Sequence, residues 1–257
     1  MSNNSIPIDF KIVIQVRVNS TRFPKKMLAK FYHNKTILDL IIEKLCCKFN
    51  PQQIVIATST NPDDLIFKDV AIKYNVNFYK GAEHNVLQRF IDTAEQFNTE
   101  NIIRVCADNP FLDIDLLVDM IDDINFSGID YCSYKVDNNP AIKTHFGFFV
   151  EATTLTALKK VRKATTNKYY LEHVTNYMYE NEGFKVKWLE APIEIQQSKN
   201  IRLTVDTIED FNLSASLYLK LMNEYNGKFN YNHILNHINK NTLLKELMEK
   251  SIIQNEK

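Results

Sequence analysis

Short apolar runs alternate with longer helical patterns through the first half of the chain. The apolar runs resemble strands buried on both faces of a sheet, and they occupy residues 11–16, 53–58, 77–80 and 101–107. Between them, apolar residues recur every three or four positions, which is typical of one face of a helix. This pattern predicts helices at residues 36–49, 62–74, 84–97 and 114–124.

The repeated strand–helix order predicts an α/β fold, with a mostly parallel central sheet and helices on both of its faces. Ligands of such sheets bind beyond the carboxyl ends of the strands. Candidate chemistry is therefore expected just after residues 16, 58, 80 and 107.

The pattern becomes less regular after residue 128. Strands are predicted at residues 130–135, 146–150, 185–190 and 201–205, and helices at 169–180 and 207–222. We interpret residues from about 130 to 200 as an inserted β-containing lobe for acceptor binding or dimerisation. Residues from about 225 to 257 are expected to form C-terminal helices and a tail. The length suits one domain spanning residues 1–257.

Charge and cysteine content narrow the class of protein. Lys plus Arg number 31, as do Asp plus Glu, so no net field favours nucleic acid or a membrane surface as partner. The apolar runs are too short for a signal peptide or for a span of about 20 residues. The four cysteines lack CxxC spacing, which argues against a zinc site. A reducing cytoplasm is the expected location.

The densest candidate site is the basic segment that follows the first predicted strand. Arg17, Arg22, Lys25 and Lys26 lie there among hydroxyl side chains. Fixed cations and hydroxyl donors at a strand end suit a triphosphate. The segment contains no glycine, so it is neither a Walker loop nor a dinucleotide fingerprint. The alternative is a solvated basic loop.

Two aspartates, Asp108 and Asp206, each follow a predicted buried strand. Carboxylates at neighbouring strand ends could converge on one Mg²⁺. The alternative is that each aspartate caps the helix that follows, with Thr207 and Asp210 completing the second turn.

Four further polar residues are candidates for acceptor contacts. Glu172 and His173 stand in the motif YLEHVT, and Asn85 and Arg89 lie one helical turn apart. For His173 the alternative is a structural place on an amphipathic helix. For Arg89 it is a pairing with an acid.

These segments, in this order, resemble the SpsF-type cytidylyltransferases of surface polysaccharide synthesis, relatives of CMP-Kdo synthetase and acylneuraminate cytidylyltransferase. The family begins with QARxxSTRLPGKxL, which reads here QVRVNSTRFPKKML at residues 15–28. Further matches are IATSTNPDD, GAEHNVLQR, RVCADNP, LEHVT and RLTVDTIEDF. The resemblance extends from about residue 11 to about residue 218.

The resemblance implies a Rossmann-like nucleotide-diphosphosugar transferase fold, CTP as donor and Mg²⁺ as cofactor. Carried over by position, the nucleotide-binding residues are Gln15, Arg17, Ser20, Thr21, Arg22 and Lys26, with Thr58 and Ser59 near the cytosine. The implied catalytic residues are Arg17, Lys26 and the metal-binding pair Asp108 and Asp206.

This sequence departs from the family pattern in three places. Lys25 replaces the usual glycine of the basic loop, and Ala107 replaces the glycine before Asp108. The acceptor region, which often carries an Asp-Gly pair, reads KTHFGFF at residues 143–149. The acceptor therefore need not be Kdo or a sialic acid.

The predicted activity is transfer of CMP from CTP to a sugar acid or related acceptor, including phosphorylated ones, with release of pyrophosphate. One alternative is a glycosyltransferase of the same fold, with Asp113 and Asp115 as its DxD motif. Another is a nucleotide-binding protein without turnover. A homodimer is also expected, with the aromatic segment of Phe146, Phe148 and Phe149 as a candidate contact.

Overall fold

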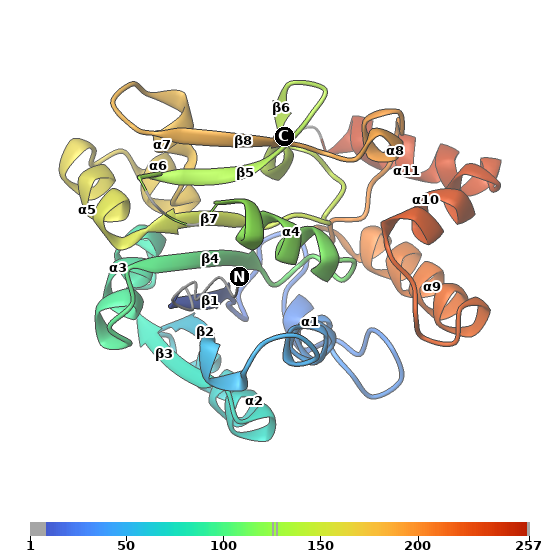
Figure 1. Cartoon of the computed structure of the whole chain (residues 1–257). Coiled ribbons are helices and arrows are strands. Elements are labelled where there is room, and N and C mark those ends of the chain that lie inside the picture. Colours follow the sequence, from blue (N-terminus) through green and yellow to red (C-terminus); the bar gives the residue numbers. More distant parts are fainter. Residues whose placement is uncertain (1–8, 125, 127, 256–257) are drawn as a thin grey trace, which may run out of the picture.

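The structure is a computed structural model that describes residues 9–124, 126 and 128–255 (Figure 1). The strands are β1 (Phe10–Gln15), β2 (Ile54–Ser59), β3 (Asn77–Gly81), β4 (Asn101–Cys106), β5 (Tyr131–Val136), β6 (Asn139–Pro140), β7 (Glu151–Thr154) and β8 (Val186–Glu190). The α-helices of the first half are α1 (Ile37–Cys46), α2 (Ile66–Tyr74), α3 (Val86–Gln96) and α4 (Ile114–Ile124). Those of the second half are α5 (Leu155–Ala164), α6 (Lys168–His173), α7 (Asn176–Glu180), α8 (Ile193–Gln196), α9 (Ile208–Glu224), α10 (Tyr231–Asn239) and α11 (Thr242–Gln254).

All the strands join one sheet in the order β3-β2-β1-β4-β7-β5-β6, with β8 paired to β5. The first-half strands β1 to β4 are parallel to one another, and β7 runs antiparallel to both β4 and β5. The predicted α/β architecture with a mostly parallel sheet is confirmed.

Two apolar clusters fill the space on either side of the sheet. One contains Ile12 and Ile14 of β1 with residues of α1, α4, α9 and α10. The other contains Val13 of β1 with residues of α3, α5 and α7. Because neighbouring residues of a strand point to opposite faces, β1 contributes to both clusters. In Figure 1, α9 to α11 gather on one side of the view and α3 and α5 on the other.

The strand predicted at residues 146–150 is wrong by several positions. That segment is irregular, and the strand is β7, which begins at Glu151. Gly147 has a φ of +67°, which a regular strand does not accommodate. The apolar residues are nevertheless buried, because Phe146, Phe148 and Phe149 belong to the core.

Residues 201–205 are likewise buried but form no strand. The backbone amides of Leu203 and Thr204 both donate to the carbonyl of His145, and that of Val205 donates to the carbonyl of Asp108 at 3.1 Å. Apolar composition predicted the burial of this segment correctly, but its amides bond to loops rather than to a neighbouring strand.

The predicted helix at residues 169–180 is two short helices, α6 and α7, separated by Val174 with a φ of +57°. Helix α5 was not predicted, although Thr154 caps it and Ala157, Leu158 and Val161 form its buried face. The middle of the chain adds β5, β7 and β8 to the central sheet itself. Its use for acceptor binding or dimerisation stays a prediction.

Within the described ranges, no helix combines the length and the apolar character needed to cross a membrane.

Candidate active site

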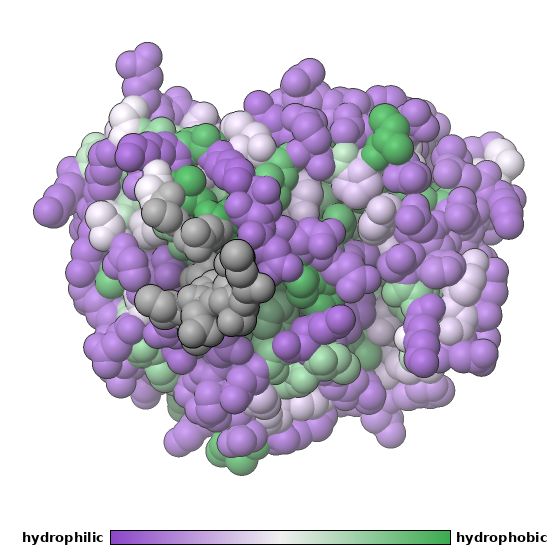
Figure 2. All heavy atoms as spheres, viewed as in Figure 1, coloured by the Kyte–Doolittle hydropathy of each residue, from purple (hydrophilic) through white to green (hydrophobic). Residues whose placement is uncertain are grey.

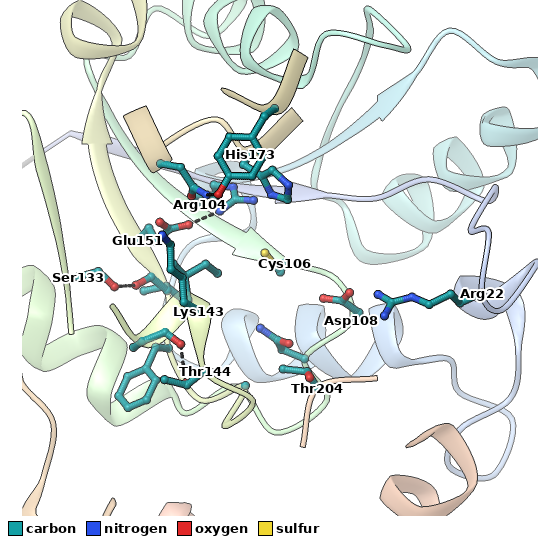
Figure 3. Close-up of a pocket in the computed structure, with 18 residues that line it drawn as sticks. Arg22, Arg104, Cys106, Asp108, Ser133, Lys143, Thr144, Glu151, His173 and Thr204 are labelled. Atoms are coloured by element: carbon teal, nitrogen blue, oxygen red, sulfur yellow. Dashed lines mark hydrogen bonds and ion pairs between the residues drawn. The ribbon is translucent and has the colours of Figure 1, made fainter. Parts of the chain in front are cut away.

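Two cavities meet beyond the carboxyl ends of β1 and β4. The smaller, of about 310 Å³, is bordered by the loop after β1, and the larger, of about 490 Å³, by the middle segment of the chain (Figure 3). Residues that line both are Arg22, Arg104, Cys106, Asp108 and His173. The parallel strands β1 and β4 bring Arg22, Cys106 and Asp108 together, because their carboxyl ends lie at one edge of the sheet, and α6 adds His173.

The loop after β1 supplies most of the smaller cavity. Residues of the predicted nucleotide site that line it are Gln15, Arg17, Ser20, Thr21, Arg22, Lys26, Asp108 and Asp206. The buried carboxylate of Asp64 holds the start of this loop by accepting from the amide of Val18 at 2.7 Å. Lys25 has a φ of 59°, so it keeps the left-handed backbone that the family's glycine would favour.

Three of the four basic residues of the loop pair with an acid. The Arg17 guanidinium lies 3.1 Å from Glu172. Arg22 Nη2 lies 2.7 Å from Asp206 Oδ1. Lys26, which is only 7% exposed, donates from Nζ to Asp108 Oδ2 at 3.2 Å and to the carbonyl of Val205. Three cations of the basic loop therefore line the cavity.

The two predicted metal-binding aspartates lie on adjacent segments, because the Val205 amide donates to the Asp108 carbonyl. Neither acts as the predicted helix cap: Asp113 accepts from the first amides of α4, and Thr207 caps α9. In the described part of the chain, no group of three or more His, Cys, Asp or Glu residues could hold a metal ion. Asp108 and Asp206 alone therefore offer Mg²⁺ an incomplete and weak site, which phosphate oxygens would complete, a mode of binding that Mg²⁺ favours.

The floor shared by the two cavities contains a buried ion pair that the sequence analysis missed. Arg104 of β4 faces Glu151 of β7 directly across the sheet and pairs with it. Glu151 also accepts from the hydroxyls of Tyr131 at 2.8 Å and Thr175 at 2.7 Å. Burial acts against the charge of Arg104, but Cys106 and Glu151 raise its pKa, so it stays charged. A lone arginine in an otherwise apolar strand was the available signal.

His173, at the end of α6, lines both cavities close to Arg104 (Figure 3). Burial and the charge of Arg104 lower the pKa of His173 below its usual value, so its imidazole is neutral at pH 7. Its neighbour Glu172 lines the smaller cavity. The structure thus brings both residues of the LEHVT motif to the site.

Four predicted site residues line neither cavity. Thr58 donates to the carbonyl of Val16 at 2.9 Å, and Ser59 donates to Asp64. Asn85 caps α3 by accepting from the Gln88 amide.

Arg89, which is 1% exposed, binds carbonyl oxygens rather than an acid, donating to those of Ala82 and Glu83. A Cβ added at Gly81 would lie 2.7 Å from Tyr79 Cε1 and 3.0 Å from Arg89 Cγ, so the glycine leaves room for both side chains. The observed contacts of Thr58, Ser59, Asn85 and Arg89 are structural, and their roles toward a ligand stay predictions.

The DxD motif of the glycosyltransferase alternative lies away from both cavities. Asp113 is 4% exposed and accepts from the amides of Asp115, Leu116 and Tyr231. Its carboxylate is therefore occupied in joining the start of α4 to α10.

A sequence model of the cytidylyltransferase family matches residues 11–248, which include every cavity residue described above. The chain belongs to the cytidylyltransferase family. It is a CTP-dependent nucleotidyltransferase, as the sequence analysis predicted.

Related proteins match this cytidylyltransferase over most of its length. The spore coat polysaccharide biosynthesis protein SpsF of Bacillus subtilis is 33% identical over 217 residues, covering 82% of this chain and 87% of SpsF. An uncharacterized protein of Methanocaldococcus jannaschii is 32% identical over 237 residues, covering 91% and 92% of the two chains.

A solved cytidylyltransferase from Leptospira borgpetersenii has a TM-score of 0.78 at 30% identity, covering 92% of this chain and 96% of that one. A CTP complex of CMP:2-keto-3-deoxy-manno-octonic acid synthetase has a TM-score of 0.61 at 12% identity, covering 82% and 98%. The second likeness supports the fold.

Proposed function

We propose that this cytidylyltransferase transfers CMP from CTP to a small, polyhydroxylated acceptor that carries an acidic group, in glycan or surface polysaccharide biosynthesis. A sugar acid or a related phosphorylated compound has this chemistry. The observation that carries the proposal is the junction of two cavities at Arg22, Asp108 and His173. A two-substrate transfer needs such a junction, since both reactants must meet there.

The smaller cavity suits the triphosphate of CTP. Arg17, Arg22 and Lys26 extend into it together with the hydroxyls of Ser20 and Thr21. Charge-assisted hydrogen bonds from guanidinium and ammonium groups are the strongest contacts that a protein offers to phosphate.

The larger cavity suits an anionic polyol. Its cations are Arg22, Arg104 and Lys143, and its neutral hydrogen-bonding residues are Asn109, Ser133, Thr144, Asn176 and Thr204. Figure 3 shows Ser133, Lys143, Thr144 and Thr204 around the space that Arg104 and Glu151 also line. Thr204 Oγ1 is buried and has no hydrogen-bond partner in the protein. It can therefore donate a hydrogen bond to a bound hydroxyl or accept one from it.

The reaction is an in-line displacement at the α-phosphorus. An acceptor oxygen forms the new bond, the bond to the bridging oxygen breaks, and pyrophosphate leaves with its electron pair. Arg17 and Lys26 neutralise charge on the phosphates as it shifts to the leaving group. Neutral His173 can accept a hydrogen bond from the attacking hydroxyl.

Asp108 and Asp206 would hold Mg²⁺ against the phosphates. The bound ion would supply charge neutralisation at the leaving pyrophosphate. All other contributions come from side chains that position the two substrates.

A pyrophosphate-release screen tests the function. The four nucleoside triphosphates are offered with sugar acids, sugar phosphates and phosphonates as acceptors. We expect release with CTP and an acidic acceptor only. Nucleotide release from a nucleotide sugar would instead indicate a glycosyltransferase, and CTP binding with no turnover across the panel would indicate a non-catalytic protein.

Conservative substitutions test the metal-binding pair. Asp108→Asn and Asp206→Asn should each reduce turnover by about a hundredfold or more, because several kcal/mol of charge neutralisation depend on the carboxylates. The matched control is Asp115→Asn, on the exposed surface of α4, which should keep wild-type turnover. Wild-type rates for both site variants at saturating Mg²⁺ would show that these residues do not bind the catalytic metal.

A further inference from the structure

The carboxylate of Asp206 lies between two arginines, one on each oxygen. Arg22 Nη2 donates to Oδ1 at 2.7 Å, and Arg202 Nη2 donates to Oδ2 at 3.1 Å. The Asp206 side chain is only 11% exposed, and each of its carboxylate oxygens has a guanidinium within hydrogen-bond distance. A divalent cation that approaches Asp206 meets both positive charges.

Arg202 is fixed in this arrangement. Its side chain is 1% exposed and donates from Nε and Nη2 to Asp210 at 2.7 and 2.8 Å. A third nitrogen, Nη1, lies 2.8 Å from His145 Nδ1. Moving Arg202 would leave buried charges uncompensated, which is strongly unfavourable.

Arg22 is in the opposite situation. Its side chain is 49% exposed, on a loop that lines both cavities. Because Arg22 is itself half exposed and Arg202 stays on the Asp206 carboxylate, Arg22 can exchange this partner for another anion at a smaller cost than a fully buried pair would pay. Phosphate is the partner for which a guanidinium is best suited, since the two can form paired hydrogen bonds.

We propose that Arg22 is an exchangeable counter-ion of Asp206. It keeps divalent cations away from the Asp206 carboxylate until a bound triphosphate takes over the Arg22 guanidinium. The proposal rests on the proposed function, because CTP is the triphosphate that reaches Arg22. Arg202 keeps the carboxylate in place throughout, and Oδ1 becomes available when Arg22 turns to phosphate. Nucleotide binding therefore raises metal affinity at Asp206, and the two ligands are thermodynamically coupled.

Binding of Mn²⁺ to nucleotide-free protein tests this proposal, with free Mn²⁺ measured by electron paramagnetic resonance. Arg22→Gln should bind Mn²⁺ about fivefold more tightly than wild type or better, since the competing cation is gone. The matched control is Arg17→Gln. It removes the same charge from the same loop, but Arg17 pairs with Glu172 and not with Asp206. Its gain should stay below about twofold, because a more distant charge is screened by salt.

Two further variants complete the test. Arg22→Lys keeps the charge and should stay near wild type, and adding Asp206→Asn to Arg22→Gln should abolish the gain. The proposal is overturned by equal gains for Arg22→Gln and Arg17→Gln, by no gain for Arg22→Gln, or by a gain that survives Asp206→Asn. Arg22 is exposed on its loop, and unchanged melting temperatures would confirm that the variants fold. The titration contains no nucleotide, so failure of CMP transfer and failure of this proposal are read separately.

Discussion

Neighbouring residues of the basic loop have very different surroundings. Lys25 is exposed, whereas Lys26 is buried against Asp108 and the Val205 carbonyl. The charge pattern in the sequence is the same for both. Their difference arises because the chain turns at Lys25 and starts a short 3-10 helix at Lys26, which directs the second side chain into the cavity.

This difference predicts unequal effects on nucleotide binding. Lys26→Ala should weaken CTP binding by about 1.5–3 kcal/mol, the scale of a charge-assisted hydrogen bond, when measured by calorimetry. The control is Lys25→Gly, which removes an exposed charge without straining the left-handed backbone and should change the affinity little. Equal losses for the two variants would mean that only the loop's overall charge matters.

At the scale of the element, two helices begin with the same capping box, but only one of these boxes lies next to the site. Thr207 caps α9 and forms a capping box with Asp210, and Thr36 forms the same box with Asp39 at α1. The Thr207 box follows Asp206 directly, and Asp210 also binds the amide of Asp206 at 3.0 Å. The Thr36 box lies outside both cavities. The two capping boxes are equivalent locally, but only the one at Thr207 helps to position a residue of the site.

Threonine-to-alanine substitutions should separate stability from positioning. Thr207→Ala and Thr36→Ala should each reduce the free energy of unfolding by about 1 kcal/mol, as loss of a cap does. Only Thr207→Ala should also reduce pyrophosphate release at saturating substrate, because it loosens the Asp206 segment. Similar turnover in both variants, at matched losses of stability, would show that the cap does not position Asp206.

The whole molecule is organised around one continuous sheet. Strand β7 lies between β4 and β5, so the middle of the chain is built into the sheet of the first half. Phe146, Phe148 and Phe149 face the core of the same chain, which removes the observation that motivated a homodimer. The face in Figure 2 carries mainly polar residues, with apolar ones in small separate groups. The homodimer stays a prediction, to be checked by light scattering.

A shared sheet predicts one cooperative unfolding transition. Trp188, the only tryptophan of the chain, lies on β8 and packs against Tyr131 and Tyr179. Its fluorescence therefore reports on the middle segment, while far-ultraviolet circular dichroism reports on all helices. The two signals should give the same urea midpoint. A lower midpoint by fluorescence would show that residues around 130–200 unfold as a separate lobe.

The sequence by itself determined the α/β class, the strands and helices of the first half, the basic loop, and Asp108 and Asp206 as candidates for the same site. These features depend on local periodicity and on the rule that parallel strands end at one edge, so tertiary contacts were not needed to predict them. The ordered motifs also identified the family.

Only the tertiary structure decided which polar side chains reach the cavities. Arg104 and Glu151 stand 47 positions apart, and they meet because β7 pairs with β4 in one register. Thr58 and Ser59 lie at the end of β2 and Arg89 on the helix after β3, yet nearby carbonyl or carboxylate oxygens bind their side chains. Residues 201–205 look like a strand because they are buried, but a strand also requires a partner for its amides. Burial can be predicted from composition, whereas pairing depends on which distant segment lies alongside.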